Sequence, residues 1–422
     1  MNHFHYIEGH LFAEDVAVEC IAEKVGTPFY CYSSATILRH YHVFADAFAK
    51  IKPLICYAVK ANSNLAVLAT LAQAGAGADI VTMGELKRAL KAGISPKKIV
   101  FSGVGKTKEE LTFALESGIY QINVESYPEL CALEEVAIKI GKTAPVALRV
   151  NPDVDAKTHA KISTGRAENK FGIPLHDIDR YIQKISSSSA LKWQGVAVHI
   201  GSQLTDLAPY REAFSQLATR IKTWAQKGIV LETIDLGGGL GIPYQGETPP
   251  LPTEYAQMIS EVFHDFQGRF ILEPGRMIVG NAGILVTKVI YVKEAAAKNF
   301  LIVDGAMNDL LRPSLYEAYH EVIPVKSSSQ TFDKQVDIVG PVCETGDYFA
   351  QNRGHFPYVE PGDMVAIRSA GAYGAVMSST YNSRPLIPEV MVHGDQFAVI
   401  RPRQTYETLL SLDLQPEWLQ NK

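Results

Sequence analysis

The segment Ile55-Cys56-Tyr57-Ala58-Val59-Lys60-Ala61-Asn62 places one lysine at the end of an apolar run. Such a run predicts a strand that is buried on both faces, as in a parallel sheet. In a barrel of parallel strands, functional groups lie at the carboxyl ends of the strands. A lysine held against low-dielectric walls loses proton affinity and becomes a nucleophile toward an aldehyde. Lys60 is therefore the first candidate for chemistry, and a lysine that merely reaches solvent from a strand end is the alternative.

Seven further short apolar segments follow, separated by stretches that include the amphipathic helical segments Gly84–Ala92, Glu109–Glu116 and Tyr127–Ile140. With the first segment, the predicted strands are Leu54–Val59, Ala78–Val81, Ile99–Phe101, Gln121–Val124, Val146–Val150, Gly195–His199, Thr233–Leu236 and Phe270–Leu272. Eight strands that alternate with helices predict an α/β fold, a parallel (β/α)8 TIM barrel.

A doubly wound open sheet is the alternative fold. The barrel is favoured because unusual residues recur at or just after the carboxyl ends of the predicted strands. These residues are Lys60, Asn151, His199, Gly237 and Glu273. In a barrel they would surround one mouth, which is where active sites form.

After Arg276 the pattern changes to shorter runs of β-branched residues that are interrupted by glycine and proline. These runs are Ile284–Val289, Phe300–Val303, Gln335–Val339, Met364–Ile367 and Phe397–Ile400. They predict a second, mainly antiparallel β domain. We expect the barrel to span residues 31–279, and the β domain to combine residues 1–30 with 280–422.

The composition excludes several classes of protein. A net charge of -5 provides no basic surface for nucleic acid, and no apolar window approaches the ~20 residues of a membrane-spanning helix. The start has no charged region followed by an apolar core, so we expect a cytoplasmic protein. The five cysteines are odd in number and widely spaced, which disfavours disulfides and a metal site. Cys343 is the one cysteine with a candidate role.

A run of glycines follows one of the predicted strands, in Ile234-Asp235-Leu236-Gly237-Gly238-Gly239-Leu240-Gly241. Glycine leaves the backbone free to direct successive N–H groups at an anion, so a phosphate is the natural ligand. The spacing differs from the dinucleotide-binding fingerprint. A tight turn with close packing is the equal alternative.

Another predicted strand ends in Leu272-Glu273-Pro274-Gly275-Arg276. A surface ion pair is the simplest interpretation of this spacing. In a barrel mouth, a carboxylate such as Glu273 can keep a pyridine nitrogen protonated, which makes the ring an electron sink. Arg276 can bind a carboxylate or phosphate bidentately. His199 could cover an aromatic cofactor, although a buried histidine with a structural role is commoner.

Five motifs occur in the order found in the pyridoxal-phosphate decarboxylases of the alanine-racemase-like fold, which the chain resembles from about Pro28 to about Val390. They are Tyr57-Ala58-Val59-Lys60-Ala61-Asn62, His199-Ile200-Gly201-Ser202-Gln203, the glycines 237–239, Glu273-Pro274-Gly275-Arg276 and Cys343-Glu344-Thr345-Gly346-Asp347. Residues 306–316, AMNDLLRPSLY, most resemble the diaminopimelate-cleaving branch rather than the ornithine- or arginine-cleaving ones. Thr345 stands where the family often has serine, with the hydroxyl retained. Residues 169–172, NKFG, also resemble a family loop, without an assigned role.

The resemblance implies pyridoxal 5'-phosphate as cofactor, with Lys60 as the Schiff-base lysine, His199 stacked on the ring and Cys343 as the acid. The implied cofactor-binding residues are Lys60, His199, Ser202, Gly238, Gly239, Glu273, Gly275, Arg276 and Tyr373. The implied substrate-binding residues are Arg276, Arg312, Tyr316, Glu344 and Tyr373. The resemblance also implies a homodimer in which Cys343 reaches the partner's barrel, so that the active sites are shared.

The expected reaction is decarboxylation of meso-2,6-diaminopimelate to L-lysine and CO2, the last step of lysine biosynthesis. Two arginines suit a distal carboxylate, and Glu344 suits a distal ammonium. An alanine racemase would use an arginine where Glu273 stands. A polyamine-pathway decarboxylase, of the carboxynorspermidine or ornithine/arginine type, is the closer alternative. A catalytically silent regulatory homologue would be expected to lack Lys60 or Cys343, and both are present.

Overall fold

In the computed structural model, which describes residues 2–155, 164–165 and 168–420, eight parallel strands close into a barrel. The strands follow the order β9-β11-β12-β13-β5-β6-β7-β8, and pairing of β8 with β9 closes the ring. They are β5 (Leu54–Ala58), β6 (Gly77–Ile80), β7 (Ile99–Phe101), β8 (Gln121–Val124), β9 (Ala144–Asn151), β11 (Leu191–Val198), β12 (Thr233–Asp235) and β13 (Arg269–Leu272). The predicted barrel is confirmed, and the open-sheet alternative is wrong.

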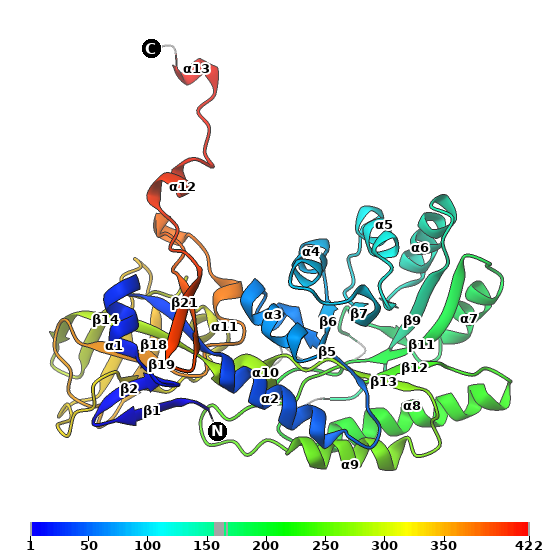
Figure 1. The fold of residues 1–422 in the computed structure, drawn as a ribbon, viewed down its shortest axis with the longest axis horizontal. Coiled ribbons are helices and arrows are strands. Elements are labelled where there is room, and N and C mark those ends of the chain that lie inside the picture. The colour runs from blue at the N-terminus through cyan, green and yellow to red at the C-terminus, as the bar shows by residue number, and fades with distance from the viewer. Residues whose placement is uncertain (1, 156–163, 166–167, 421–422) are drawn as a thin grey trace. The chain divides into compact units, whose positions relative to one another are not determined.

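Helices surround this barrel, as Figure 1 shows. They are α2 (Ser34–Ala47), α3 (Leu65–Gln73), α4 (Met83–Lys91), α5 (Lys108–Ser117), α6 (Tyr127–Lys139), α7 (Ile178–Ser186), α8 (Ala208–Gln226) and α9 (Pro252–Val262), with the short α10 (Arg276–Val279) after the last strand. Side chains of Asn64, Thr82, Thr107 and Ser126 accept backbone N–H bonds at the starts of α3 to α6. These caps explain why each helix begins one residue later.

The barrel strands are buried along almost their whole length. Every residue of β5 to β8 is buried, including Cys56 and Val100, which pack with Leu54 and Ile271 in one apolar cluster. A strand covered on both faces has no polar alternation, which explains the continuous apolar runs in the sequence. A two-residue strand, β10 (Ile173–Pro174), adds to the end of β9.

A second sheet is built mainly from antiparallel strands. Its main path is β18-β17-β15-β14-β4-β20-β21, with β19 on β14 and β16 on β19. The strands are β4 (Phe29–Ser33), β14 (Gly283–Glu294), β15 (Asn299–Val303), β16 (Val322–Pro324), β17 (Val336–Val339), β18 (Tyr348–Arg353), β19 (Met364–Ile367), β20 (Glu389–His393) and β21 (Gln396–Arg401). Pairs β15–β17 and β4–β20 are parallel.

Smaller elements complete this part of the chain. A three-stranded antiparallel sheet joins β1 (Phe4–Ile7), β2 (His10–Ala13) and β3 (Val16–Ala17). The helices are α1 (Val18–Val25), α11 (Arg312–Tyr316), α12 (Tyr406–Leu410) and α13 (Glu417–Gln420). Phe4, Leu11 and Ile21 pack with Phe29 and Val390 in a shared apolar core. The amino-terminal segment therefore folds with the carboxyl-terminal strands.

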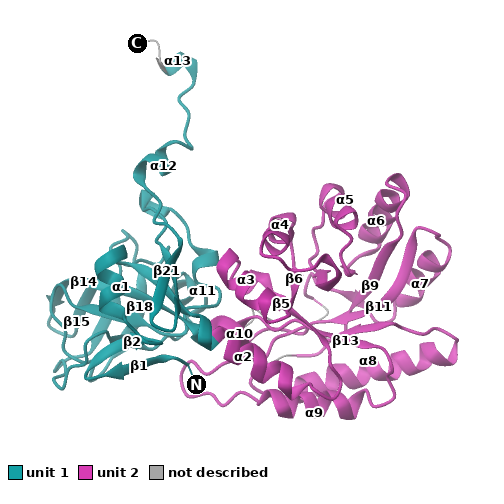
Figure 2. Ribbon diagram, in the orientation of Figure 1, with its two compact units in different colours: residues 1–36, 281–422 teal, residues 37–280 magenta. Residues whose placement is uncertain are grey.

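The chain divides into two compact units, shown in Figure 2. A barrel unit contains residues 37–280, and a β unit combines residues 1–36 with 281–422. The domain boundary expected at residue 31 falls inside β4, which pairs with β14 on one side and with β20 on the other. Backbone pairing on both edges places this strand in the β unit. Among the described residues, no helix is long and apolar enough to cross a membrane.

Candidate active site

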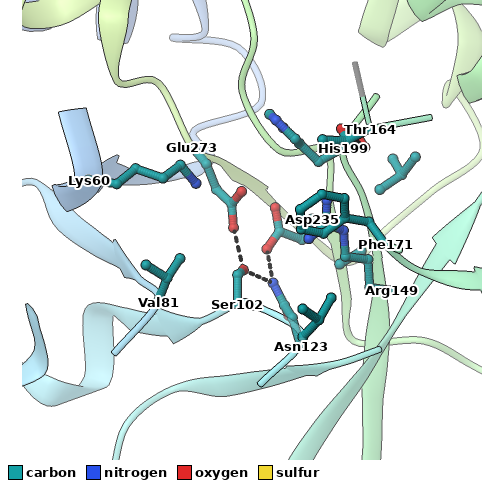
Figure 3. A pocket seen from close by; sticks show the side chains of 14 residues that line it. Lys60, Val81, Ser102, Asn123, Arg149, Thr164, Phe171, His199, Asp235 and Glu273 are labelled. Carbon is teal, nitrogen blue, oxygen red and sulfur yellow. Dashed lines mark hydrogen bonds between the residues drawn. The ribbon is translucent and has the colours of Figure 1, made fainter. Parts of the chain in front are cut away.

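A cavity of about 330 Å³ lies within the barrel unit. Most of the lining residues lie at or near the carboxyl ends of the eight barrel strands, and Figure 3 shows their side chains. The lining residues are Lys60, Val81, Ser102, Gly103, Val104, Asn123, Arg149, Thr164, Phe171, Ala197, Val198, His199, Asp235 and Glu273. Of the predicted site residues, Lys60, His199 and Glu273 line this cavity.

Lys60 lies in a single helical turn, Val59–Ala61, that follows β5. Its Nζ donates a hydrogen bond of 2.8 Å to Oδ2 of Asp79, which is fully buried in β6. The lysine side chain is about one-third exposed, at 35%. The buried carboxylate of Asp79 therefore directs the amine of Lys60 while the rest of that side chain faces the cavity.

Two carboxyl groups lie side by side in the cavity, those of Asp235 and of Glu273, which follows β13 next to β5. Oδ2 of Asp235 accepts a hydrogen bond from Nδ2 of Asn123 at 2.9 Å, and Oδ1 accepts one from the Gly237 N–H at 3.0 Å. Ser102 donates its hydroxyl to Glu273 at 3.4 Å. A hydrogen bond between the two carboxyl groups contributes to the pKa of each. Such a contact requires a proton between them.

Burial accounts for the proton affinity of this acid pair. It raises the pKa of Glu273 well above its ordinary value, with further increases from the charges of Asp235 and Asp79. Burial also raises the pKa of Asp235 from 3.8 to about 6. Two buried carboxylates in contact repel each other, so one of the pair stays protonated. We assign the proton to Glu273, because Asp235 accepts hydrogen bonds from Asn123 and the Gly237 N–H, which favour its ionised form.

His199 follows β11 and is held by the glycine turn. Its Nδ1 accepts a hydrogen bond of 3.2 Å from the Gly238 N–H. Burial, followed by the charges of Lys60 and Arg149, lowers the pKa of His199 well below its ordinary value. The ring is therefore neutral, and because Nδ1 accepts, the proton lies on Nε2.

The glycine turn after β12 has no room for side chains. A Cβ on Gly238 would lie 2.1 Å from the carbonyl oxygen of Glu273, and one on Gly239 would lie 2.4 Å from that of Gly201. Gly239 also has φ of +108°, which other residues rarely adopt. The Tyr210 hydroxyl donates to the Gly238 carbonyl at 3.0 Å. The turn is thus a rigid backbone cradle.

Arg276 is the first residue of α10, directly after Gly275, and it is buried. One of its terminal nitrogens donates to the Tyr244 hydroxyl at 2.8 Å, and the other donates to the Ser202 hydroxyl at 3.1 Å. The cation is thus oriented by two neutral oxygens. A Cβ on Gly275 would lie 3.0 Å from that of Ala58, so glycine lets this turn approach β5 closely.

The other predicted site residues belong to the β unit. Arg312 is buried in α11, where its Nε lies 3.3 Å from Nε2 of His320 and its guanidinium lies 5.9 Å from the ring centre of Tyr316. The Ser314 hydroxyl in the same helix donates to the Gly346 carbonyl.

A loop of the β unit carries Cys343 and Glu344, both exposed. The Cys343 N–H donates to Oδ1 of Asn382 at 3.2 Å, and Glu344 is hydrogen-bonded to Tyr381. The Ser314 contact with Gly346 connects this loop to α11. Tyr373 has a left-handed backbone conformation, with φ of +55°. These residues remain predictions as parts of the active site.

Several cavity residues were not predicted from the sequence. They are Ser102, Asn123, Arg149, Phe171 and Asp235, together with Asp79, which does not line the cavity but contacts Lys60. A signal for three of them exists, because Asp79, Asn123 and Arg149 are polar residues inside otherwise apolar strands. A polar side chain in a fully buried strand needs a partner, and in a barrel that partner lies at the mouth or across the interior.

The chemistry of these residues fits pyridoxal phosphate. The cavity offers an amine for an aldehyde at Lys60, and an acid for a ring nitrogen at Glu273. A glycine cradle that excludes side chains, and a buried arginine that donates to the Tyr244 and Ser202 hydroxyls, suit an anionic phosphate.

Comparison with known proteins gives the same result. The pyridoxal-binding domain of the pyridoxal-dependent decarboxylases matches residues 34–280 and so ends where the barrel unit ends. Diaminopimelate decarboxylase of Zymomonas mobilis is 50% identical over 97% of this chain and 98% of its own length. The Pseudomonas aeruginosa enzyme is 49% identical over the same shares.

Solved structures agree in fold over nearly the whole chain. Diaminopimelate decarboxylase from Helicobacter pylori, complexed with L-lysine, has a TM-score of 0.90 and 44% identity over 93% of this chain and 98% of its own. The enzyme from M. jannaschii, also in complex with L-lysine, has a TM-score of 0.94 and 37% identity over 99% and 98%. This chain belongs to the pyridoxal-dependent decarboxylases, and within them to the diaminopimelate decarboxylase family.

Proposed function

We propose that this chain decarboxylates meso-2,6-diaminopimelate to L-lysine and CO2, the last step of lysine biosynthesis, in the cytoplasm. The observation that carries the substrate assignment is the similarity at about 50% identity along nearly the whole chain to diaminopimelate decarboxylases. The barrel cavity supports the reaction type, because it combines an amine, a buried acid pair and a glycine cradle.

Pyridoxal phosphate, when bound, supplies an aldehyde that takes up amines and a ring that accepts the electron pair released with CO2. Lys60 supplies the amine for attachment of this group. Its contact with Asp79 keeps the amine at the strand end and balances the lysine charge within the buried site. Asp79 would hold the amine of Lys60 beside the cavity whenever that amine is not attached to the cofactor.

Glu273 is the residue that holds a proton opposite the ring nitrogen. Its burial next to Asp235 favours the protonated carboxyl group, so the proton is available at the oxygen that would face the ring. Once it has given up this proton, the buried Glu273 carboxylate would balance a positive charge on the ring. His199, neutral and fixed by Gly238, provides a flat surface without adding a second positive charge.

The phosphate would be held by residues around the glycine cradle. Gly238 and Gly239 would present backbone N–H groups, and Ser202 and Arg276 would add a hydroxyl and a bidentate cation. Gly275 allows the start of α10 to lie close to β5, which brings Arg276 toward the same site.

The distal amino acid group of the substrate would be recognised by the β unit. Arg312 offers a buried guanidinium for a carboxylate, with Tyr316 beside it, and Glu344 offers a carboxylate for an ammonium. Gripping the distal end decides which bond breaks, since the scissile bond must stand perpendicular to the ring. Arg276 and Tyr373 are further candidates for substrate contact.

We further propose a homodimer in which Cys343 of one chain supplies the acid to the partner's barrel. Cys343 is exposed in its own chain and belongs to the β unit, whereas the cavity is lined by barrel residues. A two-fold dimer would create two equivalent shared sites.

Product analysis tests the proposed reaction. Purified enzyme with pyridoxal phosphate is offered meso-diaminopimelate, ornithine, arginine and carboxynorspermidine in parallel, and amine products and CO2 are quantified. We expect kcat/KM for diaminopimelate to exceed the others by at least about 10⁴, because unpaired buried polar groups penalise the wrong substrate. A preference for ornithine or carboxynorspermidine would refute the substrate assignment. If none of the substrates released CO2, the proposed decarboxylase activity would be refuted.

A further inference from the structure

We propose that Glu125 is a positioning residue that fixes Arg149 and two neighbouring loops as one rim of the cofactor cavity. Glu125 follows β8 directly, and its carboxylate is only 1% exposed. It does not line the cavity, but three residues that do, Gly103, Arg149 and Phe171, depend on its contacts.

The carboxylate of Glu125 accepts three hydrogen bonds from three separate segments. Oε1 accepts from Nη1 of Arg149 in β9 at 2.8 Å and from the Gly103 N–H, after β7, at 2.8 Å. Oε2 accepts from the Gly172 N–H, before β10, at 3.1 Å. One side chain therefore holds segments that are 22, 24 and 47 residues away in the sequence.

A second buried ion pair, between Lys106 and Glu129, also holds the loop that contains Gly103. Nζ of Lys106, with a side chain that is fully buried, donates to the Gly103 carbonyl at 2.6 Å, to the Asn123 carbonyl at 2.8 Å and to Glu129 at 2.7 Å. Glu129 in turn accepts from the Glu125 N–H at 3.0 Å. Gly103 is thus fixed at both its N–H and its carbonyl group.

The third segment explains the motif at residues 169–172. Gly172 has φ of +74°, and a Cβ there would lie 3.0 Å from the Asn151 nitrogen, so this turn packs directly on β9. Nδ2 of Asn151 donates to the Phe171 carbonyl at 3.0 Å. With Gly172 held by Glu125, the Phe171 ring lies 5.0 Å from the Arg149 guanidinium.

This arrangement leaves Arg149 between an anion and an aromatic ring, with its position decided by Glu125. Without the carboxylate, a buried guanidinium would lose its counter-ion, and two loop N–H groups would lose their acceptor. Arg149 and the two loops would then lose their fixed positions at the rim of the cavity. Glu125 acts on the cofactor only through this cation and the two loops.

The first test measures how fast the holoenzyme loses pyridoxal phosphate, from visible absorbance during dialysis. Glu125→Gln keeps the shape but provides one acceptor oxygen for three donors, and we expect it to release the cofactor about tenfold faster, the effect of one charge-assisted contact. Glu125→Asp retains the charge on a shorter side chain and should fall between. Glu135→Gln is the control, since Glu135 lies in α6, shortly after Glu125 in the chain, and forms an exposed pair with Lys108 of α5.

A double-mutant cycle separates positioning from general support of the fold. If Glu125 acts through Arg149, Glu125→Gln should accelerate release far less in an Arg149→Met background than in the wild type. Equal acceleration in both backgrounds, or a folded Glu125→Gln protein that keeps cofactor as long as the control, overturns the proposal. If Glu125→Gln does not fold, the same comparison with Glu125→Asp decides. The release assay needs no substrate. Its outcome can therefore be interpreted even if the proposed decarboxylation is not observed.

Discussion

The acid pair of Glu273 and Asp235 shows how burial controls the chemistry of single residues. Each carboxyl group alone would be ionised at neutral pH, but in contact and away from water they retain one proton. Asn123 and the Gly237 N–H both donate to Asp235, which favours its ionised form and leaves the proton with Glu273. The protonation state of Glu273, the acid that would face the cofactor ring, is thus determined by Asp235.

Replacing Glu273 by glutamine tests this assignment. An amide cannot hold an acidic proton, so kcat should fall by at least about 10², while cofactor occupancy changes little because Lys60 and the glycine cradle remain. Steady-state rates and the visible absorbance of the purified variant measure the two effects. An unchanged kcat would remove Glu273 from the mechanism.

Asp309 of the β unit makes stability depend on pH. Burial raises the pKa of Asp309 from 3.8 to about 7, so between these values the folded chain keeps a proton that the unfolded chain has lost. The contribution of Asp309 to stability therefore falls as pH rises from about 4 to 7, by up to about 4 kcal/mol, and this contribution is constant above that range. Asp309→Asn should remove this loss, because its amide oxygen can still accept from the Ala306 N–H.

Urea unfolding of wild type and Asp309→Asn at pH 4.5, 5.5, 6.5 and 7.5 measures this effect. The difference in unfolding free energy should move in favour of the variant across the series. Parallel pH curves for the two proteins would show that Asp309 ionises in the fold as readily as in the unfolded chain.

At the scale of elements, the turn after β12 combines two demands that only glycine satisfies. The backbone needs a positive φ at Gly237 and Gly239, and the neighbouring backbone of Gly201 and Glu273 leaves no space for a Cβ. The turn also fixes the ring of His199 through the Gly238 N–H. A cofactor cradle and the orientation of a ring therefore depend on the same three residues.

Gly239→Ala and Gly246→Ala separate these demands. Both positions have positive φ, but a Cβ at Gly246 meets nothing within 4 Å, whereas one at Gly239 would lie 2.4 Å from the Gly201 carbonyl. We expect Gly246→Ala to cost about 1–2 kcal/mol and to keep its cofactor. Gly239→Ala should cost more and release cofactor faster, as measured by thermal unfolding and dialysis of the holoenzyme. Equal stability and equal cofactor release in the two variants would contradict the proposal that the turn at Gly239 holds the cofactor.

At the scale of the whole molecule, the predicted site is divided between two units. The barrel contributes Lys60, His199 and Glu273 to one cavity, and Arg312, Cys343 and Glu344 belong to the β unit. Association of two chains would let each β unit serve the other's barrel. This proposal can be tested by mixing two inactive variants of the protein.

Lys60→Ala and Cys343→Ala should each be inactive, and mixing them should restore activity. In a heterodimer, one of the two shared sites has both groups intact, so random exchange in equal amounts should give about a quarter of wild-type activity. Subunit exchange is followed by a tag on one variant. Exchange without recovered activity would mean that both residues come from one chain.

The eight barrel strands could be predicted from the sequence because burial on both faces leaves a continuous apolar run, which needs no knowledge of the partner strand. Their ends differ from the prediction where that signal is absent. β11 begins at Leu191, whereas the predicted strand began at Gly195. The prediction missed the first residues because Lys192 is exposed and Trp193 is half-buried, although both pair with β9. The boundary at β4 differed because pairing with β14 and β20 is invisible in a local pattern.

The sequence by itself determined the barrel, the motifs that carry Lys60, His199 and Glu273, and the family. Only the tertiary structure decided which residues support them. Asp79, Glu125 and Asp235 take their roles from partners up to 112 residues away, which lie on other strands or loops. A motif is local and can be recognised in a linear chain, but a buried charge is defined by the neighbour that compensates it, and folding alone brings the two together.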